Sequence, residues 1–303
     1  MNTLKSLLLI VLIACFVSCS KSSPDPADET VVSEADKKAN LLFAGDSAND
    51  ILSNEKFDKM LIEIAYVTGF KPTESAMTQF INYLKEHTFK TDIQLIYKEL
   101  SSPVEDELTL KEIADLEAKN RTAYTSGSTL AIYIYFADAP AEGDDLEGGL
   151  VTLGAVYRNT SMIIHEVTIK KLASKSSSIS DADVETTTLN HEFGHLFGLV
   201  NLGTDMVNDH ESQSENSDGE LAGDNHCNQN GCLMRAELLF GGSSGKSIRA
   251  NSIAQYEAGI KAGCALSGNS VLNLLQHTTA KSNAVAVGLD PECILDIRAN
   301  GGR

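Results

Sequence analysis

The chain has 303 residues, of which 42% are hydrophobic and 22% are charged, an ordinary composition for a globular protein. This length suffices for one large domain or two modest ones. The formal net charge of −18 argues against nucleic-acid binding, because such binding requires a basic face.

The N-terminal residues predict a secretory signal. The stretch MNTLKSLLLIVLIACFVSC contains an apolar run over residues 7–17 that is too short for a comfortable membrane span. A small residue precedes Cys19 and a Ser-, Pro- and acid-rich tract follows it, a layout that resembles a bacterial lipoprotein signal. The resemblance implies a signal peptide over residues 1–18, a lipid on Cys19 and a flexible tether over residues 19–38.

This interpretation places the protein in the bacterial cell envelope, held by its lipid anchor on the outer membrane and facing the periplasm or the outside. Cleavage before Cys15, or a plain cleaved signal in which Cys19 is discarded, are the alternatives. We expect the remainder, residues 39–303, to form a single domain.

Strand and helix patterns alternate along the first part of that domain. We predict strands at Lys59–Thr68, Thr91–Tyr97 and Thr129–Phe136, and helices at Thr73–Lys85, Leu108–Lys119 and, near the C-terminus, Asn251–Ala262 and Asp290–Ala299. The order strand–helix–strand–helix–strand predicts a mostly parallel sheet.

Two further strands, Leu150–Tyr157 and Ser161–Val167, are close enough in sequence to predict antiparallel pairing. A polar connector over Lys170–Ser180 follows them. At its end, Ser180 together with Asp183 can cap the next helix.

That next helix carries the most informative motif. Residues 191–203 read HEFGHLFGLVNLG. Helix positions four apart lie on the same face, so His191 and His195 can share one metal ion. Glu192 flanks that face and can take a proton from metal-bound water, a chemistry that suits zinc. The alternative, a surface helix with two solvated histidines, conflicts with the apolar residues around the motif.

The H-E-x-x-H-x-x-G run resembles the metzincin clan of zinc peptidases. In that clan a glycine, here Gly198, lets the chain turn sharply after the helix, and a third ligand, usually His or Asp, follows soon after it. The residue at the ligand position is Asn201, whose amide oxygen is a poor zinc ligand. Two later histidines, His210 and His226, can replace it.

Residues 226–234 read HCNQNGCLM and resemble the archaemetzincin segment in which the third histidine, two cysteines and the methionine of the Met-turn follow in order. The resemblance implies that His226 is the third zinc ligand and that Met234 is the Met-turn methionine beneath the metal. It also implies an insertion over residues 203–225, which we expect to be a solvated loop. His210 remains the alternative ligand, and an ordinary core position is the alternative for Met234.

Four cysteines follow the signal: Cys227, Cys232, Cys264 and Cys293. In an oxidising envelope an even set usually forms disulfides. We expect a Cys227–Cys232 disulfide that tightens the loop carrying His226, which would leave Cys264 with Cys293. Archaemetzincins instead use four cysteines for a second zinc, two of them as a close pair, and Cys264 and Cys293 form no such pair in the sequence.

The metzincin-like part spans about residues 56–240. The resemblance implies an α/β (α+β) fold: a twisted five-stranded mixed sheet with one antiparallel edge strand, an active-site helix and a smaller C-terminal part. The upper part would cover about residues 56–198 and the lower part about residues 199–303. In the family the edge strand binds substrate as an added strand, and Leu150–Tyr157 is the matching candidate.

The function that the resemblance implies is a lipid-anchored endopeptidase that acts on peptides or proteins with one catalytic Zn2+ ion and Glu192 as general base. The alternative is a catalytically inactive envelope lipoprotein that retains the fold and binds a glycan or a partner protein. Asn201 favours this alternative, whereas the retained Glu192 argues against it. A purely structural zinc is a third interpretation, although such sites prefer four protein ligands that include Cys.

Overall fold

The computed structural model describes residues 34–144, 151–175, 179–215, 219–235 and 288–303, all within the unit Ser33–Arg303. The expected signal peptide, Cys19, Cys264 and the helix expected at residues 251–262 lie outside the described residues. Helix α1 (Glu34–Ala39) begins inside the stretch expected to be the tether, so regular structure starts earlier than the composition indicates. Among the described residues, no helix combines the length and the apolarity needed to cross a membrane.

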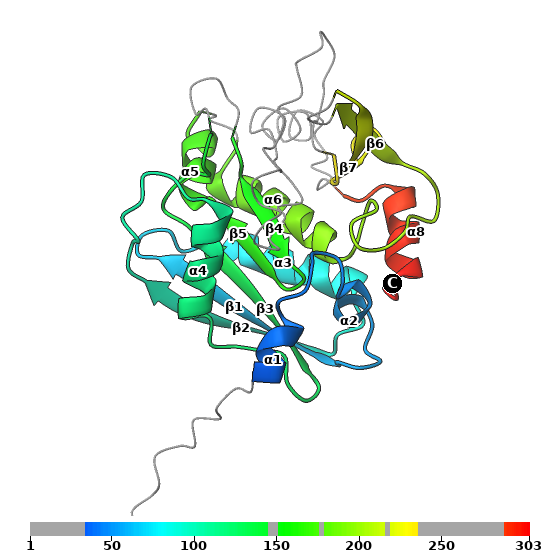
Figure 1. Cartoon of the computed structure of the whole chain (residues 1–303), viewed down its shortest axis with the longest axis horizontal. Coiled ribbons are helices and arrows are strands. Elements are labelled where there is room, and N and C mark those ends of the chain that lie inside the picture. Colours follow the sequence, from blue (N-terminus) through cyan, green and yellow to red (C-terminus); the bar gives the residue numbers. More distant parts are fainter. Residues whose placement is uncertain (1–33, 145–150, 176–178, 216–218, 236–287) are drawn as a thin grey trace, which may run out of the picture. The chain divides into compact units, whose positions relative to one another are not determined.

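A five-stranded sheet lies at the centre of the fold (Figure 1). Its strands are β1 (Lys59–Val67), β2 (Asp92–Leu100), β3 (Thr129–Phe136), β4 (Gly154–Arg158) and β5 (Ser161–Ile164). The spatial order is β2-β1-β3-β5-β4, and every pair is parallel except β4–β5. Only Asn159 and Thr160 join β4 to β5, a link too short for the crossover that a parallel pair needs. The structure thus confirms the expected mixed sheet with one antiparallel edge strand.

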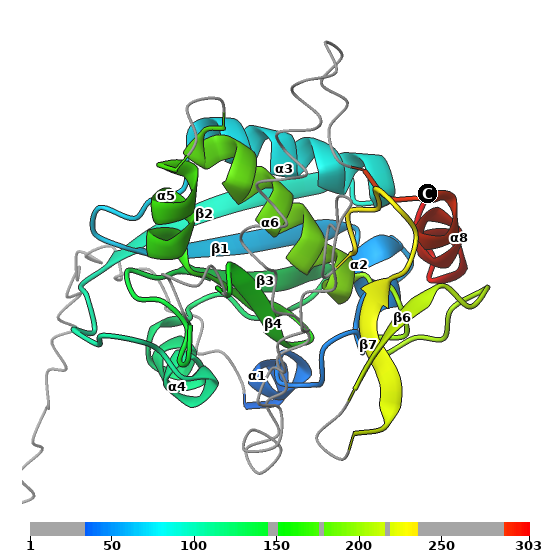
Figure 2. The ribbon, with the colours of Figure 1, turned by 90° about the horizontal axis from the view of Figure 1, so that it is seen from above.

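Helices cover both faces of this sheet. They are α3 (Glu74–His87) and α6 (Asp181–Leu196) on one face and α4 (Leu110–Asn120) on the other, as Figure 2 shows. Side chains of β1 alternate between the two layers, so that Ile64 packs with α3 and α6 whereas Ala65 packs with α4. Burial on both faces explains why β1 and β3 read as near-continuous apolar runs.

Helix α6 begins as its sequence predicts. Ser180 Oγ accepts the backbone N–H of Asp183, while the Asp183 carboxylate accepts the backbone N–H of Ser180, a reciprocal capping box. Further along, Phe193 packs edge-on against Phe80 of α3, with 5.2 Å between the ring centroids. The HEFGH motif therefore lies on a capped helix that is packed into the main core.

Two elements correct the sequence-based expectation. Helix α5 (Glu166–Ala173) replaces the end of the strand expected at Ser161–Val167 and the start of the polar connector. Strands β6 (Glu211–Glu215) and β7 (Leu221–Cys227) form a two-stranded antiparallel sheet where a solvated loop is expected. Most β6 and β7 side chains are polar, so the hairpin lacks the apolar alternation by which a strand is recognised.

Two further helices lie beside the end of α6. They are the short α2 (Ala48–Leu52) and α8 (Pro291–Ala299), the latter confirming the closing helix expected from the sequence. Asp290 caps α8, because its carboxylate accepts two backbone N–H groups of the first turn. At the other end of α8, Asn300 Nδ2 donates to the carbonyl of Phe197, which joins the last helix to the end of α6.

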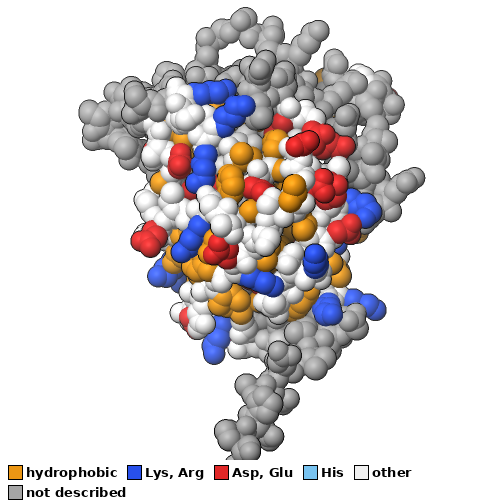
Figure 3. Space-filling view, turned by 90° about the vertical axis from the view of Figure 1, so that its left-hand side faces the viewer, with side chains coloured by type: hydrophobic (Ala, Val, Ile, Leu, Met, Phe, Trp, Pro, Cys, Tyr) orange, Lys and Arg blue, Asp and Glu red, His pale blue; other side chains and the backbone are white. Residues whose placement is uncertain are grey.

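The described surface is mixed in charge. On the face shown in Figure 3, Lys and Arg side chains are scattered among Asp, Glu and hydrophobic side chains rather than gathered into one patch. This face therefore presents no field of a single sign that would indicate one class of charged partner.

Candidate metal centre

Three histidine rings meet beside the C-terminal part of α6. His191 and His195 lie one helical turn apart, with 5.0 Å between their ring centroids. His226, from β7, lies 5.5 Å from the ring of His191 and 5.3 Å from that of His195. One ring nitrogen from each of the three lies within 4.8 Å of the others, and all three residues are buried. The structure thus brings together the three histidines that the sequence analysis singles out as ligands.

Two of these rings are oriented by backbone carbonyl groups. His191 Nδ1 lies 2.7 Å from the carbonyl oxygen of Leu233, and His226 Nδ1 lies 2.8 Å from that of Asp224. Because a carbonyl oxygen only accepts, each Nδ1 carries the proton and donates it. Each Nε2 then keeps its lone pair, which is the arrangement that ligating histidines show.

His195 is the third member and has a different environment. Its side chain is fully buried, and neither ring nitrogen has a hydrogen-bond partner among the described residues. Burial, followed by the neighbouring His191 and His226, lowers the pKa of His195 well below its usual range. Burial and His226 likewise lower the pKa of His191 to about 3. The neutral, buried imidazole of His195 is costly unless a cation takes a lone pair from it, so the donor set of the three rings fits a zinc ion.

Glu192 is buried next to this group of histidines, against the edge strand. A Cβ atom added to Gly154, the first residue of β4, would lie 2.8 Å from Glu192 Cγ and 3.0 Å from Thr188 Cγ2. The edge strand therefore passes directly beside the glutamate, and only a glycine leaves the glutamate its space. The sequence marks Glu192 through its motif, but nothing in it indicates this role of Gly154.

Asn201 does not belong to the histidine group. The chain turns after α6 with left-handed backbone conformations at Gly198, Val200 and Asn201, whose φ angles are +75°, +54° and +63°. This turn leaves Asn201 exposed, and its Nδ2 donates to Glu211 Oε2 at 3.2 Å. The same Glu211 carboxylate accepts the backbone N–H of Asn225 at 2.7 Å. Asn201 therefore joins the post-helix turn to the β6–β7 hairpin through a hydrogen bond that the sequence does not indicate.

His210 also lies apart from the three rings. It is buried, with Nε2 at 3.5 Å from Asp296 Oδ2 and 3.6 Å from Cys293 Sγ. The structure thus groups His226, and not the alternative His210, with the two histidines of α6.

Met234 packs against α6 at the HEFGH motif. It is fully buried, and a Cβ atom added to Gly194 would collide with its sulfur atom. Gly194 directly precedes His195, so the thioether lies against the backbone between the two α6 histidines. The role of Met234 as a Met-turn methionine beneath a metal stays a prediction.

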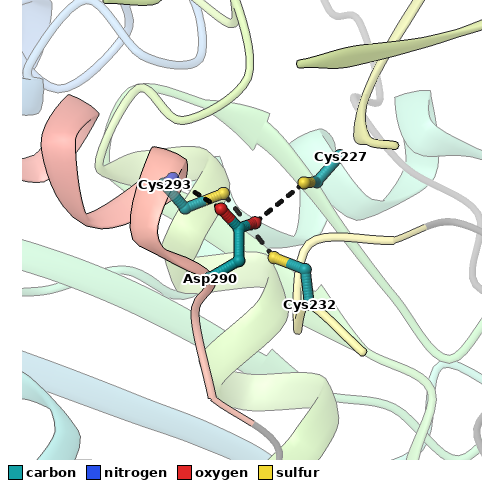
Figure 4. Close-up of side chains that lie close together, drawn as sticks. All are labelled: Cys227, Cys232, Asp290 and Cys293. Carbon is teal, nitrogen blue, oxygen red and sulfur yellow. Dashed lines mark hydrogen bonds between the residues drawn. The ribbon is translucent and has the colours of Figure 1, made fainter. Parts of the chain in front are cut away.

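The cysteines correct the expected disulfide. Cys227 and Cys232 are free thiols, and Cys293 is a third free thiol beside them rather than a partner of Cys264. Cys232 Sγ lies 3.6 Å from Cys293 Sγ, and Cys227 Sγ donates to Asp290 Oδ2 at 2.9 Å (Figure 4). The spacing between Cys227 and Cys232 suggested a local bond because the sequence does not show that α8 returns to this loop.

These four groups form a second cluster, which we call the thiol cluster: Cys227, Cys232, Asp290 and Cys293. One ligand atom from each lies within 4.8 Å of the others. Contacts with Cys227 and Cys293 lower the pKa of Cys232 to about 5, whereas contact with Cys232 raises the pKa of Cys227. Proximity and burial of several potential anions indicate that this cluster too can accept a cation.

Comparison with known proteins gives little independent information. No protein-family model matches the sequence, and no curated protein matches it significantly. Among solved structures, the chain is similar to the crystal structure of archaemetzincin from Methanopyrus kandleri, with 13% sequence identity, a TM-score of 0.44, and coverage of 80% of this chain and 96% of that chain.

Proposed function

We propose that the protein is a zinc-dependent endopeptidase in which His191, His195 and His226 hold one catalytic zinc ion and Glu192 is the general base. The convergence of three buried imidazoles beside a buried glutamate is the observation that supports this proposal. Three protein ligands leave a position for water and substrate, as in catalytic zinc sites, whereas structural sites use four.

The chain's own residues define the rest of the chemistry. A zinc ion held by the three Nε2 atoms would lower the pKa of water to about 7 and polarise a carbonyl group. Glu192, one residue after His191, takes a proton from the attacking water and returns it to the leaving nitrogen. The carbonyl groups of Leu233 and Asp224 hold two of the imidazoles in the orientation that exposes Nε2.

The edge strand β4 supplies a place for an extended peptide. Among the described strands β4 pairs on one side only, with β5, and its first residue touches Glu192. A substrate added as a further strand beside β4 would present its backbone carbonyl groups next to the base.

The geometry does not favour the inactive binding protein. Asn201 was the feature that favoured loss of activity, because it stands where the clan places its third ligand. In the structure Asn201 has a different contact, with Glu211, while His226 stands with the other histidines. Although Asn201 departs from the clan's ligand pattern, the chain therefore still has three histidines that can serve as zinc ligands.

Hydrolysis of casein by the purified chain, together with its zinc content, tests the proposal. Glu192→Ala should lower the hydrolysis rate by about 10²–10⁴-fold, because general base catalysis contributes that factor, while the zinc content stays unchanged. Glu105→Ala, which removes an exposed glutamate from the loop before α4, is the matched control and should retain full activity. Zinc bound without cleavage of any protein substrate across a range of pH would instead indicate the binding protein.

The membrane anchor remains part of the proposal and rests on the N-terminal sequence alone. Cys19 after a short apolar run would receive the lipid and hold the enzyme on the outer membrane. Cells grown with labelled palmitate should incorporate label into the wild-type chain and not into Cys19→Ser. An unlabelled wild-type chain would show that the signal is of the plain, cleaved kind.

A further inference from the structure

His226 is carried by an irregular part of the β6–β7 hairpin. The pairing of the two strands shifts between Glu211 and Gln213, and opposite Ser212 the other strand has the whole stretch Asp224–His226. Such a bulge bends its strand and re-aims the side chains that it carries. The third histidine therefore lies outside the regular ladder, and the direction of its ring depends on the contacts that hold the bulge.

The carboxylate of Glu211 holds this bulge from the neighbouring strand. Its Oε1 accepts the backbone N–H of Asn225 at 2.7 Å and the side-chain amide of Asn225 at 3.4 Å. Asn225 has a left-handed backbone with φ of +61°, a conformation that costs energy for residues other than glycine. A Cβ atom added to Gly223 would lie 2.4 Å from Glu211 Cδ, so the carboxylate lies directly over the backbone at the start of the bulge. Glu211 thus fixes the residue that immediately precedes His226.

The same carboxylate reaches the turn that follows α6. Its Oε2 accepts a hydrogen bond from Asn201 Nδ2 at 3.2 Å. Asn225 Nδ2 adds a second link, because it donates to the carbonyl oxygen of Val200 at 3.3 Å. These hydrogen bonds join the bulge to the end of the helix that carries the other two histidines.

The central sheet does not position the hairpin. Among the described strands, β6 and β7 form a sheet of their own, so the backbone ladder of the five central strands does not extend to His226. The placement of its ring beside α6 therefore depends on contacts between the hairpin and its neighbours. Glu211 makes contacts that reach both the bulge and the turn after α6.

We propose that Glu211 is the positioning residue for His226, and that Asn201 serves as the partner of this carboxylate instead of as a ligand. This inference rests on the proposed role of the three histidines. Asn201 stands where the clan that the sequence resembles has its third ligand, so the same turn here holds the bulge that supplies the replacement. Loss of the carboxylate would release Asn225, let the ring of His226 move away from the other two rings and weaken the binding of metal.

Competition for Zn2+ between the reduced full chain and a chromogenic chelator tests this role. His226→Ala identifies the equivalent of zinc that the histidine group binds, because that equivalent loses affinity. Glu211→Ala should lower the affinity for the same equivalent by about 10–100-fold, the loss typical of residues that orient a ligand. Glu211→Gln keeps Oε1 as an acceptor for the Asn225 N–H and should restore most of the affinity.

A double-mutant cycle separates positioning from stability. If Glu211 acts through His226, Glu211→Ala should not change the zinc affinity in a His226→Ala background, whereas a general loss of stability would persist there. Asn201→Gly removes one contact and suits the left-handed backbone, so it should lower the affinity less than Glu211→Ala and tests the proposal if that variant does not fold. Gln213→Ala, at an exposed position of the same strand, is the control and should bind zinc as tightly as wild type.

Wild-type affinity in folded Glu211→Ala, or an equal loss with and without His226, would overturn the positioning role. Wild-type affinity in Asn201→Gly would overturn the part assigned to Asn201. If zinc affinity falls as expected but casein is never cut, the proposed function fails and this inference stands. Casein cleavage together with unchanged zinc affinity in Glu211→Ala would have the opposite meaning, and wild-type zinc binding in His226→Ala would overturn both.

Discussion

Gly154 and Glu192 lie so close together that a Cβ atom at position 154 would collide with the glutamate side chain. The base of the proposed reaction is buried, and its Cγ would lie 2.8 Å from the Cβ atom of any larger residue at position 154. Real Cβ atoms do not approach this closely, so a side chain there must displace the glutamate, Thr188 or the edge strand. Glu192 can therefore occupy this position because residue 154 on the neighbouring strand has no side chain.

Gly154→Ala should lower kcat for casein hydrolysis by on the order of 10²-fold, the loss expected when a catalytic group moves by about 1 Å. Alanine in a strand reduces the entropy cost of folding, whereas the clash raises the energy of the folded state, so stability is measured beside kcat. The checks are kcat, the zinc content and the urea midpoint of both proteins. Unchanged kcat in a folded, zinc-loaded variant would show that Glu192 tolerates the methyl group.

At the scale of elements, α6 is held by charged contacts as well as by its apolar side. Glu185 on α6 is buried and accepts the backbone N–H and the hydroxyl of Thr73, the residue that caps α3. Glu166, at the start of α5, is buried nearby, with Lys170 Nζ 3.4 Å from its Oε1. Burial, followed by Glu185, raises the pKa of Glu166 to about 9. Glu166 is therefore protonated at neutral pH.

This arrangement predicts a pH dependence of stability. The folded state keeps the Glu166 proton up to about pH 9, whereas the unfolded chain loses it near pH 4.5. Between these values the folded state binds more protons, so the free energy of unfolding should fall as the pH rises. Glu166→Gln cannot titrate and should show a flatter dependence in urea unfolding between about pH 5 and pH 9. An identical slope in both proteins would show that Glu166 is ionised in the folded state.

At the scale of the whole described unit, the histidine group and the thiol cluster join segments that the sheet does not hold. The histidine group connects α6 to β7, and the thiol cluster connects the 226–234 segment to α8. These parts lie at the C-terminal end of the fold, where the small β6–β7 sheet is separate from the central five strands. Ions bound at these two clusters would therefore replace the contacts that a larger core otherwise supplies.

Removal of metal should consequently lower the Tm of the chain. An ion that binds only the folded state stabilises it by about 2.7 kcal/mol when its free concentration is 100 times the Kd. Calorimetry with and without EDTA should show this loss, and re-addition of Zn2+ should reverse it. His191→Ala should show a smaller decrease on chelation because it lacks one ligand. A Tm that chelation does not change would mean that the isolated protein carries no stabilising ion.

The sequence by itself determined the features that depend on local periodicity. The i, i+4 spacing of His191 and His195 requires only a helix, and the Ser180–Asp183 box that starts this helix lies within one turn of chain. The apolar runs separated by amphipathic helices likewise predicted the parallel strands, and the short link after Arg158 predicted the antiparallel edge.

Only the tertiary structure decided which distant groups complete the two clusters. Cys293 lies beside Cys232, which is 61 positions earlier in the sequence, because α8 packs beside the end of α6. No local sequence pattern indicates this contact. For the same reason the sequence favoured a bond between Cys227 and Cys232. The resemblance of residues 226–234 favoured His226 over His210, and the fold places His226 beside α6 and His210 beside α8. Side chains far apart in sequence are brought together by packing, so their partners are fixed by the fold as a whole.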